Sequence, residues 1–139
     1  MVTINLKGRE IPLLYTVWEM KQIQEEIAPL NKVVDVIMGR NPEDEEEQSL
    51  FGGPEHLKAV ARMIRILGNA GLEEAGEAAD LTDKKVLRAM KPSEFLEGIN
   101  ACMNAMNEGM ERETPGEKKK QGPVDVTLEE IEKKKEKES

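Results

Sequence analysis

Apolar residues that recur every three or four positions run through most of this chain, and this spacing constrains the fold more than any other feature. Such spacing puts apolar side chains on one face of a helix, so the core has to form between packed helices. The pattern is clearest at Val17, Met20, Ile23 and Ile27. Because similar stripes recur in four later segments, we expect a mainly α-helical fold with about five helices.

The N-terminus has a different pattern. Apolar and polar residues alternate over residues 2–6, and a second apolar run follows at Ile11–Tyr15. Between them, Gly8 can take the positive φ that a tight hairpin turn requires. The sequence therefore predicts a small β-hairpin over Thr3–Tyr15, ahead of the helices.

Capping signals place the ends of the first two helices. Thr16 and Glu19 have the spacing of a capping box, in which each side chain binds the backbone amide of the other residue. Pro29 ends this helix, because the residue before a proline avoids the helical region. A second helix is predicted over Asn31–Met38, with Gly39 just beyond its C-terminus.

Three further helices follow. Pro54 is suited to the first turn of the third helix, and we expect the glycines of Gly68–Gly71 to stop it. The pattern over Leu72–Asp80 leaves that stretch unassigned. Thr82 caps a short fourth helix, and Pro92 starts the fifth.

The chain divides into two parts near residue 110. Residues 1–110 form the expected helical domain with its N-terminal hairpin. Residues 111–139 hold nine acidic and eight basic side chains but few large apolar ones. Such a segment buries too little surface to offset backbone ordering, which costs about 1–2 kcal/mol per residue. We expect a disordered, charged C-terminal tail.

The charge and the cysteine content limit the possible partners and the compartment. The formal net charge is -8, which repels phosphate backbones and anionic lipids, so neither nucleic acid nor membrane is an expected partner. The single cysteine cannot form an internal disulfide, and the N-terminus does not resemble a signal peptide. No apolar run approaches the roughly 18 residues of a membrane span. A cytoplasmic protein is predicted.

The residues capable of chemistry are too few to build a catalytic site. The only histidine, His56, is expected to be an exposed helix residue, and Cys102 to be inert packing beside an apolar stripe. The acidic run Glu43–Glu47 lacks the alternating ligands and central glycine of a calcium loop, so a solvated loop is expected there. No phosphate-binding or dinucleotide-binding glycine motif is present. We therefore expect no enzymatic activity, no cofactor and no metal.

One apolar stripe has two interpretations. Its members follow spacings of three and four within the fifth predicted helix, as in the seam of a helix-on-helix contact. The stripe is either ordinary core or an adaptable groove for a partner or a second copy, since methionine-rich surfaces adapt to different ligands. The candidate partner-binding residues are Leu96, Ile99, Met103, Met106 and Met110.

The order of these elements resembles a known family. A hairpin at Thr3–Leu13 precedes the capped helix Thr16–Glu26, and the helical pair Leu81–Met90 and Pro92–Met110 leads into the charged tail. This layout is similar to that of the tail assembly chaperones of long-tailed, siphovirus-type bacteriophages, especially those of Gram-positive hosts. The resemblance covers roughly residues 3–110.

The resemblance implies a binding function. Chaperones of this family coat the helical tape-measure protein, help recruit tail tube subunits in the host cytoplasm, often self-associate, and are absent from the finished virion. The alternative is an acidic adaptor or inhibitor that binds a single host or phage enzyme. A third interpretation, a small hydrolase or metal enzyme, requires ligands that the sequence lacks.

Overall fold

The computed structural model describes residues 1–40 and 51–111, and this part of the chain is mainly helical with an N-terminal β-hairpin, as predicted. The predicted acidic loop and the charged tail lie outside the described residues. The elements are β1 (Thr3–Leu6), β2 (Arg9–Pro12), α1 (Val17–Glu26), α2 (Leu30–Ile37), α3 (Pro54–Glu74), α4 (Asp83–Ala89), the 3-10 helix η1 (Pro92–Glu94) and α5 (Phe95–Glu111).

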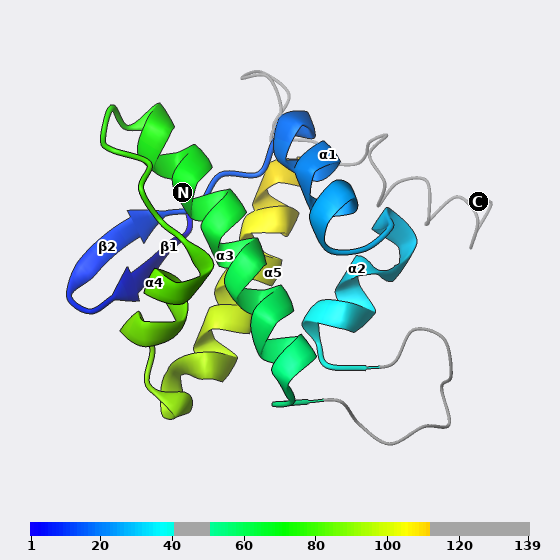
Figure 1. Cartoon of the computed structure of the whole chain (residues 1–139). Coiled ribbons are helices and arrows are strands. Elements are labelled where there is room, and N and C mark those ends of the chain that lie inside the picture. Colours follow the sequence, from blue (N-terminus) through cyan, green and yellow to red (C-terminus); the bar gives the residue numbers. More distant parts are fainter. Residues whose placement is uncertain (41–50, 112–139) are drawn as a thin grey trace.

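Figure 1 shows α3 and α5 in the centre, with the hairpin and α4 on one side and α1 and α2 on the other.

The hairpin turns through two residues. Lys7 and Gly8 have φ angles of 56° and 84°, which is the signature of a type I′ turn, whose twist matches that of the strands. The antiparallel register places Thr3 opposite Pro12. Hydrogen-bonded and non-hydrogen-bonded pairs alternate from the turn, so Pro12 falls at a non-hydrogen-bonded pair and its missing N–H breaks no bond within the hairpin.

The predicted caps of α1 and α2 are confirmed. The Thr16 N–H donates to Glu19 Oε1 at 2.9 Å, and the Thr16 hydroxyl accepts from the backbone of α1. Just beyond the C-terminus of α2, Gly39 has a φ of 81°. The N–H of Arg40 then donates to Asp35 O at 2.8 Å, which satisfies a carbonyl that the helix itself leaves unpaired.

The prediction that Gly68–Gly71 stops the third helix is wrong. Helix α3 continues through both glycines and ends at Glu74; Gly76, which has a φ of 78°, follows its C-cap residue Ala75. Residues 72–74, left unassigned above, belong to its last turn. A glycine inside a helix costs about 1 kcal/mol relative to alanine, so these two glycines need a compensating reason.

Close packing against the hairpin supplies that reason. A Cβ atom at Gly71 would lie 1.9 Å from Pro12 O of β2. One at Gly68 would lie 3.1 Å from Ile11 Cγ2 of β2 and 2.7 Å from Leu81 Cδ1, in the segment before α4. The absence of side chains at both positions lets β2 lie directly on the helix. The glycines therefore allow close packing of the hairpin and of Leu81 on α3 instead of ending the helix.

The core fills the space around α3. One cluster of buried side chains makes up the core. It joins α3 to the inner faces of the hairpin, α1, α2, α4 and α5. The largest side chains that are fully enclosed are Ile11, Leu13, Ile23, Ile37, Met63, Ile64, Leu67, Leu72 and Ile99.

A polar network also crosses α3. The Arg65 guanidinium pairs with Glu26 of α1 and, through Nε, with Asp83 Oδ1 of α4 at 2.8 Å. Arg62 Nη1 donates to Glu26 O at 3.0 Å. These two arginines therefore tie the C-terminus of α1 and the N-terminus of α4 to the central helix.

We predict that Gly71→Ala destabilises the protein although alanine is the better helix former. The added methyl group meets the rigid backbone carbonyl of Pro12, so α3 and the hairpin have to separate. The expected loss is at least about 2 kcal/mol in urea unfolding, within the range of overpacked cores.

The matched control is Gly98→Ala. A Cβ there would meet the flexible ends of Met90 and Ile64 at 3.2 and 3.3 Å, which can move by a few tenths of an ångström. A loss below about 1 kcal/mol is expected. Equal losses in the two variants would show that the Pro12 contact is not the constraint.

Candidate functional site

The α5 stripe faces the core. Ile99 and Met106 are buried, while Met103 and Met110 are half-buried against the same core cluster. Only Leu96 of this set is exposed, with 56% of its surface accessible. Most of the stripe therefore packs in the core of the domain. Its use as a partner-binding surface stays a prediction, and Leu96 is the one residue of the five that a partner can reach directly.

Cys102 lies on the same helix and is fully enclosed. Burial raises the pKa of its thiol to about 12, because the charged thiolate loses its solvation. At neutral pH the sulfur therefore keeps its proton and cannot act as a nucleophile.

The expectation that His56 is exposed is wrong. Its ring is 3% exposed, with Nδ1 accepting the N–H of Gly52 at 2.9 Å and Nε2 lying 2.7 Å from Ile37 O. Because Nδ1 accepts, Nε2 carries the proton and donates it to that carbonyl. Phe51 and Phe95 lie against the ring, with centroid distances of 4.8 and 5.1 Å.

His56 is therefore a structural link between α2, the start of α3 and α5. Both ring nitrogens are occupied by backbone partners, which leaves no lone pair for a metal and no proton for a substrate. Over residues 1–40 and 51–111, no three His, Cys, Asp or Glu residues are grouped as metal ligands. None of the helices described is both long and apolar enough to cross a membrane.

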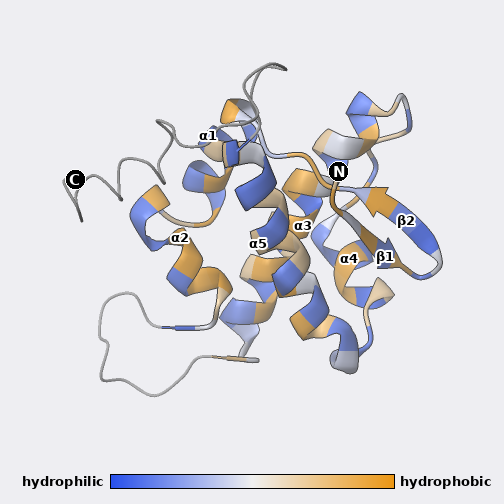
Figure 2. Cartoon of the chain, turned by 180° about the vertical axis from the view of Figure 1, so that it is seen from behind, coloured by the Kyte–Doolittle hydropathy of each residue, from blue (hydrophilic) through white to orange (hydrophobic). Residues whose placement is uncertain are grey.

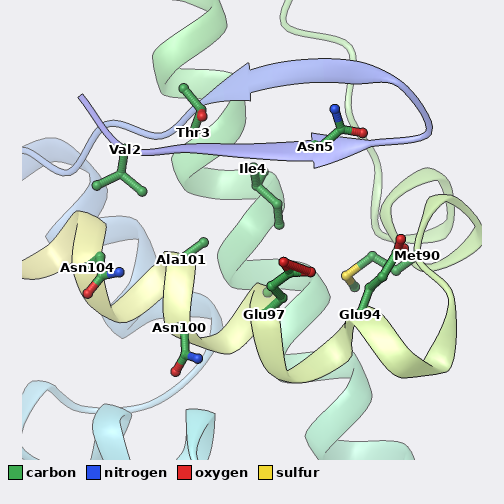
Figure 3. A pocket seen from close by; sticks show the side chains of 11 residues that line it. Val2, Thr3, Ile4, Asn5, Met90, Glu94, Glu97, Asn100, Ala101 and Asn104 are labelled. Carbon is green, nitrogen blue, oxygen red and sulfur yellow. The ribbon is translucent and has the colours of Figure 1, made fainter.

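A first surface hollow lies between β1 and α5, with a volume of about 470 Å³. Figure 3 shows Glu97 turned toward the strand and Asn100 turned away from it. The hollow is lined by Glu94 and Glu97 but by no basic side chain. The backbone groups of Thr3 and Asn5 point away from β2 along this edge, because their pairs with β2 are not hydrogen-bonded.

A second hollow of about 530 Å³ lies on the other side of the hairpin, beside α4. Its charges have the opposite sign, for it is lined by five basic side chains and by no acidic one. Apolar side chains of the hairpin and the α4 region complete the lining. The basic residues are Lys7, Arg9, Lys84, Lys85 and Arg88, and the apolar ones are Leu6, Ile11, Leu81 and Ala89.

A third surface feature is an apolar row along α2, formed by Leu30, Val34 and the C-cap residue Met38. These residues are spaced by four, so they lie on one side of the helix, and each is 36–41% exposed. Val33 and Ile37 face the core. Helix α2 therefore has apolar residues on its outer side as well as on its inner side, and in Figure 2 orange segments alternate with the blue of its polar residues.

No protein-family model, curated protein or solved structure matches this chain. What supports a function is therefore the order of the elements and these three surface features.

We predict that His56→Ala destabilises the fold strongly. The substitution leaves Ile37 O and the Gly52 N–H without their partner and opens a gap between two aromatic rings. Unpaired buried polar groups and a lost large side chain together cost about 3 kcal/mol. The control Lys58→Ala, on an exposed position of the same helix, is expected to change the free energy of unfolding by less than about 0.5 kcal/mol. Similar small effects from both variants would contradict the linking role.

We also predict a specific alkaline destabilisation through Cys102. Its folded pKa is raised, so the native state keeps a proton that the unfolded chain releases, and stability falls as the pH rises from about 9 toward 12. Between pH 9 and pH 10 the wild type is expected to lose about 1 kcal/mol more stability than Cys102→Ala in urea unfolding. Parallel pH profiles for the two proteins would show that the thiol does not titrate in this way.

Proposed function

We propose that this protein is a tail assembly chaperone of a long-tailed bacteriophage. In this role it binds the helical tape-measure protein and helps recruit tail tube subunits in the host cytoplasm. The proposal is supported by the order of elements, in which a tight hairpin is followed by a capping-box helix and later by a short helix that leads into a long one. It involves no catalysis, cofactor or metal.

The α2 row carries the proposal. A tape-measure helix has apolar stripes that aggregate when left bare, and a helical partner recognises such a stripe with residues spaced by three or four. Leu30, Val34 and Met38 have this spacing on one side of α2 and are accessible. In this proposal the row packs along the tape-measure helix.

The size of the row favours many weak contacts over a single tight one. Fully burying one such side chain contributes about 1.5–3 kcal/mol, and these three are already more than half covered. One copy therefore binds weakly. Many copies along one long helix gain from multivalency, which suits a protein that has to leave before the tail is finished.

We predict that the tagged full chain, purified from phage-induced cells, carries a very long helical protein in substoichiometric amount together with tube subunits. Mass spectrometry of the purified material is the measurement. Recovery of a single enzyme at equal stoichiometry would instead support the adaptor or inhibitor interpretation.

The same experiment with two variants tests the surface. Val34→Asp puts a charge in the middle of the row and is expected to reduce recovery of the long partner at least about tenfold, since a buried unpaired charge is strongly unfavourable. Leu87→Asp on α4 is the matched control, because Leu87 is 38% exposed against 39% for Val34. Unchanged recovery with Val34→Asp would exclude the α2 row as the binding surface.

A further inference from the structure

The hollow beside α4, called the basic groove from here on, is positively charged although the chain as a whole is acidic. The whole chain has a net charge of -8, yet this groove is lined only by basic and uncharged residues. Two of the five basic residues share one carboxylate: Arg9 Nη1 lies 3.5 Å from Asp80 Oδ1, and Lys85 Nζ lies 3.8 Å from Asp80 Oδ2. The groove therefore keeps a net positive charge.

The remaining three basic side chains have no ion pair within the described part of the chain. Lys7 comes from the hairpin turn, and Lys84 and Arg88 come from one side of α4, where their spacing of four makes them neighbours. Leu6, Ile11 and Leu81 supply the apolar part of the lining. The groove thus combines unpaired positive charge with apolar surface.

Lys7 also occupies a backbone conformation that does not suit it. Its φ of 56° lies in the left-handed region, where a side chain with a Cβ is strained and where type I′ turns favour asparagine or glycine. An Asn-Gly pair would make a more stable turn than Lys7-Gly8. A residue that is unfavourable for stability but lines a hollow is a candidate for function.

We propose that this groove binds an acidic, partly apolar segment of another protein, with Asp or Glu side chains on both sides of one or two large apolar residues. The acidic groups would pair with Lys7, Lys84 and Arg88 while the apolar side chain covers the lining residues. The site is separate from the α2 row and does not depend on the tape-measure protein being a partner.

Two observations favour a protein segment over nucleic acid. The groove is lined by no aromatic side chain on which a base could stack. A long polyanion would also meet the net negative charge of the rest of the protein, including the Glu94 and Glu97 side of the hairpin. A short acidic segment meets only the basic side.

The test is a substitution that moves stability and binding in opposite directions. Lys7→Asn creates the favoured Asn-Gly turn, so the melting temperature is expected to rise. It also removes one cation, so affinity for a short peptide with central leucines flanked by glutamates is expected to fall about threefold to fivefold. Binding is measured by NMR titration of the isotope-labelled full chain, with shifts expected in residues 7–9 and 83–89.

Controls separate this site from general electrostatics. Lys21→Asn removes an equally charged residue from α1, outside the groove, and is expected to leave affinity unchanged, whereas Arg88→Glu should weaken binding about tenfold or more. Equal affinity for a peptide with lysines in place of glutamates, shifts confined to other elements, or tighter binding of a single-stranded oligonucleotide would each overturn the proposal. So would wild-type affinity in Lys7→Asn.

Discussion

The contact between the Pro12 carbonyl and the glycine face of α3 determines where the hairpin lies, and the rest of the domain is arranged around it. With no side chain at Gly71 or Gly68, β2 rests on the helix backbone and directs Ile11 into the core. The hairpin then has two open sides. One side faces α5 across an acidic hollow and the other faces α4 across a basic groove. Both hollows are lined in part by the hairpin that this close approach holds against α3.

Local signals made the helix ends predictable. The capping box of Thr16 and Glu19 and the positive φ of Gly39 depend on residues within one turn of each other, so the sequence contains all the required information. The two glycines inside α3, by contrast, could not be interpreted from local sequence. In isolation Gly68 and Gly71 indicate a helix end, and their place inside a helix is explained by tertiary neighbours: Pro12, far earlier in the chain, for Gly71, and Leu81 together with Ile11 for Gly68.

The surface features were less predictable because each combines distant segments. The net charge indicated an acidic protein and could not predict a basic groove, because the groove is formed by residues as far apart in the chain as Lys7 and Arg88. The inward rotation of His56 depends on a carbonyl of α2, which no pattern around residue 56 reveals. In the α5 stripe, periodicity identified one apolar face correctly but could not separate the buried Ile99 from the exposed Leu96. Leu96 is exposed although it lies only three residues from the buried Ile99.

The position of the hairpin has a consequence for biosynthesis. The first apolar strands leave the ribosome long before α3 and α5, which cover them in the finished domain. At translation rates of about 5–20 residues per second, the hairpin waits roughly 5–20 s for the residues of α5. An isolated two-stranded hairpin is marginally stable in water, so during that interval Ile4, Ile11 and Leu13 stay accessible to other chains. This domain therefore completes its fold only after α5 has been synthesised, and substitutions that slow the docking of α3 onto the hairpin should reduce soluble yield more than their effect on final stability indicates.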